Sequence, residues 1–361
     1  MEKVFGFSRL LVSAESVDAP FAQPMLERFR LAGIPTEMVT TPRVDAHPWA
    51  LMRGTLILLP RPMMGWITPA QHGSLAVREA ENYLHPIIGC QAGCTYCYLQ
   101  ARPEGRRPLR MHVRVDELIR AVEEHANRDE GTGPLFSTGE LADSLLDAEL
   151  FPVAAVLVKR FAETDIGRLE LRTKSARVES LLDIEHRRQT TVAFSLAPAH
   201  HIRWYEPGTA SLGERLDAAS RLADVGYPVA IKCEPVILDE GWETAYEEMF
   251  RLVAQTIGPP RLDHVSVGCL RWSPELAKLP AFRRRHGNDL AEGTWIEYRP
   301  DRYNGTLRKQ DRLNTYAHIR EMLHASDIRC PIWWSLEEAD VIAQLDAAGS
   351  NPGRPKDPGR R

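Results

Sequence analysis

The sequence lacks any hydrophobic run long enough to span a lipid bilayer. A transmembrane helix needs about 20 apolar residues, whereas the longest apolar runs, such as Thr55–Pro60 and Val153–Val158, have six residues each. The first 17 residues are interrupted by charged side chains and lack the apolar centre of a signal peptide. We therefore expect a cytoplasmic protein without a membrane partner.

The chain also lacks a large excess of charge of either sign. Its 45 basic and 49 acidic residues give a formal net charge of −4, so the molecule as a whole does not attract polyanions such as nucleic acids. Binding of phosphate groups would have to come from local basic patches. The apolar fraction of 43% and the length of 361 residues predict a soluble protein with one large barrel and appendages, or with two modest domains.

Cysteines are few, and they are unevenly spread. Six cysteines in a long chain without an export signal argue against a disulfide framework and for reduced thiols. Three of them, Cys90, Cys94 and Cys97, form a C-x3-C-x2-C motif within eight residues. Three thiolates on one short loop can each bind one iron of a cubane cluster, which leaves the fourth iron open to an exogenous ligand.

A zinc site and a set of unligated thiols are the alternatives to the cluster. A closed structural zinc site needs four protein ligands; His85 could supply the fourth, but no second pair of cysteines is nearby. The three residues could also be free thiols packed in a loop, although their spacing is compact and the segment is polar. The number of available ligands favours the iron–sulfur cluster.

A regular alternation of strand-like and helix-like segments begins near residue 83. The strand-like segments are His85–Gly89, Leu135–Thr138, Leu169–Arg172, Thr191–Leu196, Val229–Val236 and His264–Cys269. The helix-like segments between them are Val115–Asn127, Leu145–Glu163, Leu212–Val225 and Trp242–Thr256. This order predicts βαβ units with a parallel sheet, and right-handed crossovers would curl that sheet into a partial or full barrel.

We expect this α/β chain to divide into four parts. Residues 1–75 form a small N-terminal α/β appendage with a helix at Met25–Leu31, and residues 76–275 form the barrel. Residues 276–345 form a C-terminal extension on the substrate side, and residues 346–361, rich in Gly, Pro, Lys and Arg, form a disordered tail.

The carboxyl ends of the barrel strands are the place to look for chemistry, because such barrels carry their active sites there. Four chemically capable residues follow or end the first four predicted strands in order: Cys90, Glu140, Lys174 and Ser195. The sequence therefore predicts that these side chains meet at one mouth of the barrel.

The residues around the cysteine motif resemble those of a known enzyme family. The run Cys94-Thr-Tyr96-Cys97-Tyr98-Leu99-Gln100 is similar to the cluster loop of the spore photoproduct lyase family of radical S-adenosylmethionine (SAM) enzymes. The likeness covers about residues 4–330 and continues through Arg172-Thr173-Lys174, Ala193-Phe194-Ser195, Glu206-Pro207-Gly208-Thr209, Gly226-Tyr227-Pro228 and Glu240-Gly241-Trp242. It implies a partial (β/α)6 radical SAM barrel.

The resemblance also implies cofactors and a reaction class. The three cysteines would hold a [4Fe–4S] cluster, and S-adenosyl-L-methionine would bind its open iron and yield a 5′-deoxyadenosyl radical. An electron donor such as flavodoxin or ferredoxin would reduce the cluster. The reaction it implies is a lyase-type repair of damaged DNA pyrimidines, with DNA or a nucleotide as the substrate.

Resemblance to radical SAM enzymes assigns roles to five residues near the cluster. Lys174 matches a lysine near the SAM carboxylate, and Ser195 matches a serine that hydrogen-bonds SAM. Thr138-Gly139-Glu140 resembles instead the Gly-Gly-Glu element of other radical SAM enzymes, whose carboxylate binds the SAM ammonium group. Tyr96 and Tyr98 match tyrosines that relay a hydrogen atom, with packing against the adenine or the barrel mouth as the alternative.

Residues later in the chain match positions near the substrate of that family. These are Arg271 and Trp272 after the sixth strand, and Arg302 and Tyr303 in a later basic segment. They could form a phosphate-binding rim together with Arg106, Arg107, Arg110 and Arg114. A solvated charged face is the alternative for such residues.

Glu140 departs from the family's pattern, because it stands where the family has a cysteine that donates a hydrogen atom to the product radical. A carboxylic O–H bond is too strong to replace a thiol in that step. Cys233 or Cys269 could serve instead if its thiol faced the barrel interior. Otherwise the scaffold acts on another substrate, such as a peptide, nucleoside or metabolite, or the chain is a non-enzymatic iron–sulfur or zinc protein.

Overall fold

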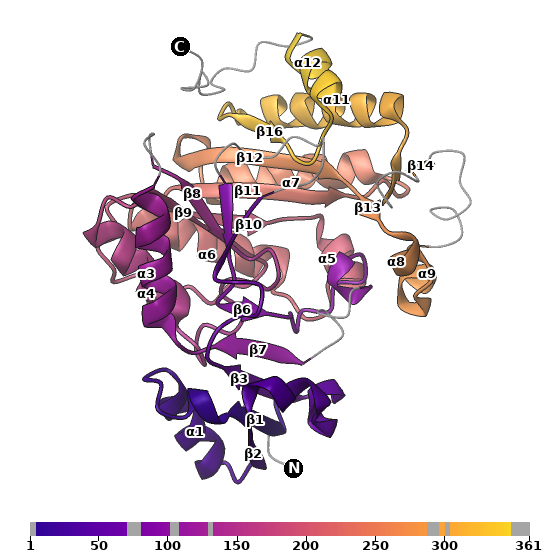
Figure 1. The fold of residues 1–361 in the computed structure, drawn as a ribbon. Helices are drawn as coiled ribbons and strands as arrows, with labels where there is room; N and C mark the ends of the chain where they lie inside the picture. Colours follow the sequence, from indigo (N-terminus) through magenta and orange to yellow (C-terminus); the bar gives the residue numbers. More distant parts are fainter. Residues whose placement is uncertain are drawn as a thin grey trace.

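The computed structural model describes residues 5–70, 81–101, 108–128, 133–286, 296–299 and 304–347. These residues form three sheets with helices packed against them (Figure 1). One continuous hydrophobic core runs from the N-terminal sheet through the main sheet to the C-terminal helices. No helix among the described residues has the length and apolar character needed to cross a membrane.

The N-terminal sheet has five strands in the order β2-β1-β3-β7-β6 and lies at the bottom of Figure 1. Its strands are β1 (Arg9–Ser13), β2 (Thr36–Val39), β3 (Thr55–Leu59), β6 (Ile87–Ile88) and β7 (Leu109–His112). The pairs are parallel except for β6 with β7. Helix α1 (Ala22–Leu31) crosses from β1 to β2 and ends before Gly33, whose φ of +62° suits a residue without a Cβ.

The main sheet has eight strands in the order β16-β12-β11-β10-β9-β8-β5-β4. Their bounds are β4 (Ile67–Pro69), β5 (Glu81–Leu84), β8 (Leu135–Thr138), β9 (Arg168–Thr173), β10 (Thr190–Ser195), β11 (Val229–Val236), β12 (Leu262–Cys269) and β16 (Ile332–Trp334). The six strands from β5 to β12 are all parallel, β16 adds a seventh parallel strand, and β4 is antiparallel at the other edge. The predicted partial (β/α)6 barrel is confirmed.

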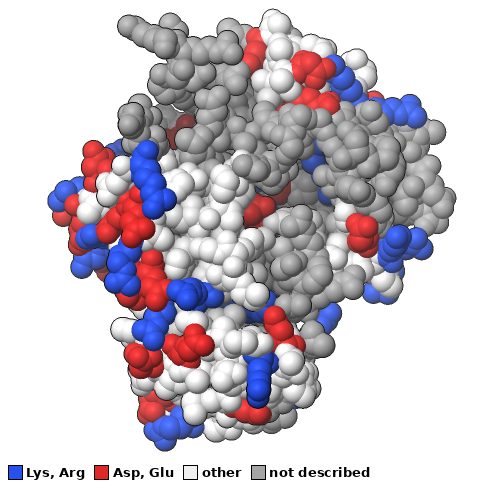
Figure 2. Space-filling view, in the orientation of Figure 1, with Lys and Arg blue, Asp and Glu red and all other residues white. Residues whose placement is uncertain are grey.

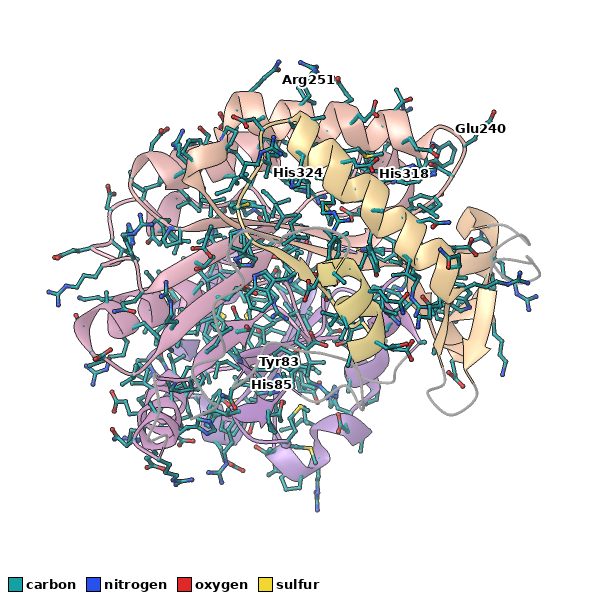
Figure 3. The ribbon with its side chains drawn as sticks, turned by 90° about the horizontal axis from the view of Figure 1, so that it is seen from above. Tyr83, His85, Glu240, Arg251, His318 and His324 are labelled. Atoms are coloured by element: carbon teal, nitrogen blue, oxygen red, sulfur yellow. The ribbon has the colours of Figure 1, made fainter. Side chains whose placement is uncertain are left out.

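Helices pack against one face of this sheet and continue into the C-terminal region (Figure 1). They are α3 (Val115–Ala126), α4 (Val153–Glu163), α5 (Ala199–Tyr205), α6 (Leu212–Asp224), α7 (Trp242–Thr256), α11 (Lys309–Ala325) and α12 (Ala339–Ala347). Short 3-10 helices occur at Ala14–Ser16, Thr41–Ala46, Pro48–Leu51, Tyr98–Gln100, Glu179–Leu181 and Pro259–Arg261. Seen from above in Figure 3, α11 lies across the main sheet and carries His318 and His324.

A third sheet lies beside the main one, with antiparallel strands in the order β13-β15-β14. Its strands are β13 (Arg271–Trp272), β14 (Ile296–Arg299) and β15 (Asn304–Leu307), and the short helices α8 (Pro274–Ala277) and α9 (Pro280–His286) follow β13. The region after residue 275 thus adds β16 to the main sheet and β14 and β15 to the third sheet.

Two predicted elements differ from the structure, and proline explains both. The segment predicted as the first barrel strand, His85–Gly89, is wrong: β5 fills that place, and β6 joins the N-terminal sheet instead. Pro86 separates the two strands because it cannot donate a ladder hydrogen bond. The helix predicted to start at Leu145 begins only after Pro152, whose ring suits a helix start.

The chain passes between the two larger sheets more than once. Strand β4 precedes residue 75 yet joins the main sheet, whereas β6 and β7 follow it and join the N-terminal sheet. The four-part division of the chain stays a prediction. The predicted disordered tail, apart from its first two residues, lies outside the described residues.

Candidate active site

The three cysteines lie on a loop that leaves β6 and ends in the 3-10 helix Tyr98–Gln100. All three are free thiols; Cys94 is buried, and Cys90 and Cys97 are half-buried. The Cys97 backbone N–H donates to the Cys94 carbonyl at 3.1 Å, which closes a tight turn between these two residues.

The loop that follows α5 fastens this cysteine loop to the barrel. The backbone N–H of Thr95 donates to the Tyr205 carbonyl at 2.8 Å, and that of Gly208 donates to the Ala92 carbonyl at 2.9 Å. A Cβ on Gly208 would lie 2.7 Å from the Ala92 oxygen. Only glycine therefore allows the two backbones to approach this closely.

At least one pair of the three cysteine sulfur atoms lies farther apart than two sulfur ligands of one zinc ion would. Zinc holds its sulfur ligands at about 2.3 Å, so tetrahedral geometry puts them about 3.8 Å apart. In the described part of the chain, the cysteines do not form a group of three ligand atoms within 4.8 Å of one another. Each sulfur of a cubane site binds a different iron, which requires a wider spacing.

Among the described residues, His85 and the cysteines do not form a group of ligand atoms close enough for one metal ion. His85 Nε2 lies 2.8 Å from the Thr68 hydroxyl oxygen, and burial lowers the pKa of His85 to about 4. Burial has the opposite effect on the thiols and raises the pKa of Cys97. Burial and repulsion from Asp143 together raise the pKa of Cys90. The thiols are therefore protonated before they bind metal, and binding has to release protons.

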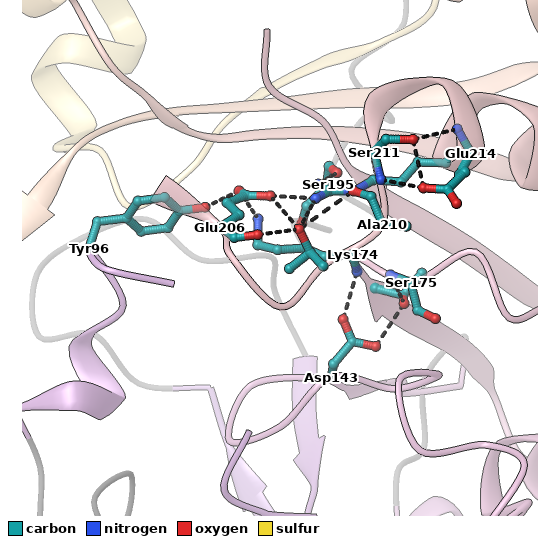
Figure 4. Close-up of polar contacts among 12 residues, drawn as sticks. Tyr96, Asp143, Lys174, Ser175, Ser195, Glu206, Ala210, Ser211 and Glu214 are labelled. Atoms are coloured by element: carbon teal, nitrogen blue, oxygen red, sulfur yellow. Dashed lines mark hydrogen bonds and ion pairs between the residues drawn. The ribbon is translucent and has the colours of Figure 1, made fainter. Parts of the chain in front are cut away.

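A buried ion-pair network lies directly against the cysteine loop (Figure 4). Glu206 is 3% exposed, and its carboxylate is 3.0 Å from Lys174 Nζ and 2.5 Å from Arg215 Nη2. It also accepts a hydrogen bond from the Tyr96 hydroxyl. Lys174 and Arg215 outweigh the effect of burial and lower the pKa of Glu206 to about 2.

Lys174 connects this network to the cysteines. Its ammonium lies 5.7 Å from the centre of the Tyr96 ring, and its charge opposes the burial-driven rise in the pKa of Cys94 and Cys97. The sequence did not single out Glu206 or Arg215 as site residues. Glu206 stands in the Glu-Pro-Gly-Thr motif, which was the available signal.

Glu140 is held at the end of β8 by two other side chains. The Tyr98 hydroxyl donates to its Oε1 at 2.7 Å, and Arg172 Nη1 lies 3.8 Å from its Oε2. Gly139 precedes it with a φ of +98°, and a Cβ there would lie 2.7 Å from the Arg172 carbonyl oxygen. The glycine thus lets the chain turn sharply and present Glu140 next to the cysteine loop.

Asp143 links the ends of β8 and β9. Its carboxylate accepts hydrogen bonds from the Lys174 backbone N–H at 2.6 Å and from the Thr173 hydroxyl at 2.7 Å. The backbone N–H groups of Leu145 and Leu146 also donate to it, each at 2.9 Å. These four bonds fix the position from which the Lys174 side chain reaches Glu206.

The face of the main sheet opposite the helices is polar. Leu169, Leu171, Ile231 and Cys233 belong to the core under the helices, so their strand neighbours point the other way. These neighbours include two ion pairs, Arg172 with Glu170 at 2.8 Å and Lys232 with Glu234 at 3.1 Å. Ser195 of β10 is in register with Lys232 on the same face.

Cys233 and Cys269 face the helix layer. Cys233 is fully buried beside Tyr246 of α7, and Cys269 lies beside Tyr316 of α11, whose hydroxyl is 3.1 Å from the Cys269 backbone N. Cys330 packs against the same core. All six cysteines lie in the described residues, so the only thiols at this mouth are those of the cysteine loop.

Of the predicted substrate residues, the structure describes Arg271, Arg110 and Arg114, and each of them is paired with a carboxylate. Arg271 Nη2 is 2.6 Å from the buried carboxylate of Glu337. Arg110 pairs with Asp45 at 2.5 Å, and Arg114 pairs with Asp18 at 2.9 Å. Arg302, Tyr303, Arg106 and Arg107 lie outside the described residues.

The fold and the site together define a class of protein. A partial α/β barrel that presents three free cysteines beside the carboxyl ends of its strands is the architecture of radical SAM proteins. A family model described as "Spore photoproduct lyase" matches residues 76–271, which is more than half of the chain. The chain belongs to the spore photoproduct lyase family.

Two curated relatives are both named spore photoproduct lyase. The protein of Bacillus subtilis (strain 168) is 30% identical over 172 residues, which cover 48% of this chain and 50% of that protein. The protein of Clostridium acetobutylicum is 24% identical over 266 residues, which cover 71% of this chain and 76% of that protein. The matched region thus spans about half the length of the first relative.

Solved structures of spore photoproduct lyase share the fold. One, complexed with dinucleoside spore photoproduct, has a TM-score of 0.80 at 22% identity and covers 92% of this chain and 100% of that chain. A double mutant with bound AdoMet and dinucleoside spore photoproduct has a TM-score of 0.77 at 21% identity, with 92% and 99% covered. At these identities the likeness establishes the architecture.

Proposed function

We propose that this chain is a radical SAM enzyme of the lyase class, with a [4Fe–4S] cluster on Cys90, Cys94 and Cys97. The observation that carries the proposal is the loop of three free cysteines at the mouth of the barrel. When bound, the reduced cluster with SAM supplies a 5′-deoxyadenosyl radical. Membership of the spore photoproduct lyase family supports this assignment.

The chain's own residues would prepare the site for these cofactors. Lys174 places a positive charge beside Cys94 and Cys97, which favours their thiolate forms and the carboxylate of SAM. Glu140 would bind the ammonium group of SAM, with its carboxylate oriented by the Tyr98 hydroxyl. Ser195 lies on the polar face of the sheet, where it would hydrogen-bond SAM.

Tyr96 and Tyr98 would act by position and not by ionisation. Burial raises the pKa of Tyr96 well above its usual value, with Glu206 nearby adding to the effect. Both hydroxyls donate hydrogen bonds to carboxylates in this structure. We propose that each stays a neutral O–H group, which suits either hydrogen-atom relay or adenine packing.

The proposed substrate is a damaged pyrimidine in DNA or in a nucleotide. Solved structures of the family's fold hold dinucleoside spore photoproduct. On the face shown in Figure 2, basic and acidic side chains are interspersed and do not form one basic stripe. The substrate proposal therefore depends on the barrel mouth and not on a basic surface. A flipped-out lesion would have to enter that mouth. Arg271, Arg302 and Tyr303 remain the proposed substrate contacts.

A second candidate is a radical SAM enzyme of the same scaffold that acts on a polar substrate outside DNA. Two observations favour it. The thiols of Cys233 and Cys269 face the helices, so neither replaces the hydrogen donor that Glu140 displaces. The polar face of the sheet carries Lys232 and Glu234 as an ion pair, and such charges suit a peptide, nucleoside or metabolite better than a stacked pyrimidine pair.

The test is anaerobic reconstitution with iron and sulfide, reduction, and measurement of 5′-deoxyadenosine with and without dinucleoside spore photoproduct. We expect SAM cleavage in the wild type, loss of it in Cys97→Ser, and full retention in the control Cys330→Ser. Cleavage by Cys97→Ser would contradict the cluster assignment. Consumption of the lesion supports the first candidate, whereas cleavage with an intact lesion supports the second.

The same chemistry bears on location and partners. A cluster ligated by three thiolates needs reduced cysteines, which a cytoplasmic environment maintains. A low-potential donor such as flavodoxin or ferredoxin would supply the electron. We propose both on the basis of the cysteine loop.

A further inference from the structure

A second group of metal-binding side chains lies at the same end of the main sheet. His200 and His201 begin α5, just after β10, and Asp239 follows β11. The Nε2 atoms of His200 and His201 lie 3.0 Å and 2.9 Å from Asp239 Oδ2. Among the described residues, these three form the group of His, Cys, Asp or Glu side chains whose ligand atoms all lie within 4.8 Å of one another.

Several polar atoms of this group are buried and lack a hydrogen-bond partner. His201 is 1% exposed, and its Nδ1 has no hydrogen-bond partner. Its Nε2 lies 2.9 Å from Asp239 Oδ2, an oxygen that is also hydrogen-bonded to His200 Nε2. Asp239 Oδ1 is also buried without a partner. Buried polar atoms are rarely left in this state, so the group has the unsatisfied ligand atoms that a metal ion would use.

We propose that His200, His201 and Asp239 form a binding site for a divalent transition-metal ion, separate from the cysteine loop, with Zn2+ as the first ion to test. Imidazole and carboxylate ligands suit zinc. Zinc holds nitrogen and oxygen ligands at about 2.0–2.2 Å, so tetrahedral geometry puts them about 3.4 Å apart. The two measured separations from Asp239 need to widen only slightly.

The surroundings of the site allow an ion to enter and to keep an open position. The His200 side chain is 43% exposed, so one side of the group faces solvent. The neighbouring Glu240 points outward (Figure 3) and leaves Asp239 as the carboxylate of the site. Three protein ligands leave a fourth position for water or an anionic group.

The site would also stiffen the support of the cysteine loop. Helix α5 carries both histidines and ends at Tyr205, whose carbonyl accepts the hydrogen bond from Thr95. An ion bound between α5 and Asp239 would therefore join the loops after β10 and β11. This is a different site from the three cysteines, and it does not depend on the reaction that the cluster supports.

The test is zinc binding to the full chain after the cluster has been reconstituted, so that iron occupies the cysteines. Zinc and iron per chain are measured by mass spectrometry after dialysis, and zinc affinity by calorimetry. We expect one zinc ion per chain with unchanged iron. His200→Ala removes an exposed ligand, and Asp239→Asn keeps the side-chain shape; each should weaken binding at least about tenfold. His324→Ala, on α11, is the matched control and should bind as the wild type does.

Three outcomes would overturn the proposal. They are no stoichiometric zinc binding, equal affinity in the two ligand variants and the control, and zinc uptake that displaces iron. The last outcome would mean that zinc binds the cysteines. Because His200 is partly exposed, loss of binding in His200→Ala with an unchanged melting temperature without zinc cannot be attributed to misfolding.

Discussion

Replacement of Glu206 by glutamine tests how the buried network supports the site. The substitution keeps the shape of the side chain but removes the negative charge between Lys174 and Arg215. Arg215 is fully buried, so it would be left without its counter-charge. Removing one partner of a buried ion pair is strongly destabilising, typically by about 3–5 kcal/mol.

The pKa of Glu206 gives a second value for the free energy that its charge contributes to folding. It falls from the ordinary value of 4.5 to about 2 in the folded protein, which corresponds to about 3 kcal/mol at neutral pH. Because the folded pKa is lowered, this contribution is complete above about pH 4.5 and is lost as the pH falls towards 2. An unfolding entropy of about 2.1 cal/mol/K for each of the 361 residues converts about 3 kcal/mol into a fall in Tm of about 4 °C.

The assay is thermal unfolding of the apoprotein at pH 7 and pH 3, with the exposed capping residue Glu214 as the control. Glu206→Gln should melt about 4 °C below the wild type at pH 7, and the difference should shrink at pH 3. Glu214→Gln should lower Tm much less than Glu206→Gln does, because Glu214 is exposed and supports only the start of a helix. A Glu206→Gln protein that melts at the wild-type temperature at pH 7 would show that the buried charge does not stabilise the fold.

Two further substitutions test the local geometry. Gly208→Ala should lower Tm and the iron retained per chain, because its Cβ would lie 2.7 Å from a backbone oxygen. The control Gly213→Ala has open space around its Cβ and should change neither quantity. Equal iron loading in the two variants would contradict the role given to the close contact between Gly208 and Ala92. Burial raises the pKa of Asp147 to about 6 in the folded protein. The wild type therefore loses stability as the pH rises from about 4 to 6, whereas Asp147→Asn does not. The free energy of unfolding of Asp147→Asn should rise relative to that of the wild type by about 1 kcal/mol between pH 5 and pH 7.5. Unfolding curves at the two pH values measure this gain, and a constant difference would argue against a raised pKa.

The main elements of the fold follow from local patterns in the sequence. The bounds of β8, β11 and α7 agree with those predicted, because short apolar segments and an amphipathic helix are signals that a single sequence carries. The placement of β6 could not be predicted in the same way. It depends on Pro86 and on pairing with β7, which lies more than 20 residues further along the chain.

The site was predictable where chemistry is concentrated in a motif and not where it depends on tertiary contacts. Glu140 and Lys174 were expected at strand ends, and they lie beside Tyr98 and Tyr96 of the cysteine loop, although that loop leaves a strand of the N-terminal sheet. The roles of these residues stay predictions. Glu206 forms an ion pair with Arg215, which lies on α6 and becomes buried only when that helix packs against the sheet. A buried ion pair of this kind has no signature in sequence spacing.

The polar face of the sheet is also visible in the sequence of β11. In β11, Ile231 and Cys233 alternate with Lys232 and Glu234, and period-two alternation of this kind marks a strand with one polar face. It also indicates on which face Cys233 lies. The alternation therefore predicts a thiol that faces the helices, as the structure has it.

The cluster assignment is tested most directly by electron paramagnetic resonance of the reconstituted, reduced protein before and after addition of SAM. We expect about four irons per chain and a reduced-cluster signal that changes when SAM binds the open iron. We also expect the signal to be absent from a variant in which Cys90, Cys94 and Cys97 are all replaced by alanine. A signal that SAM leaves unchanged, or one that survives in that variant, would contradict the assignment.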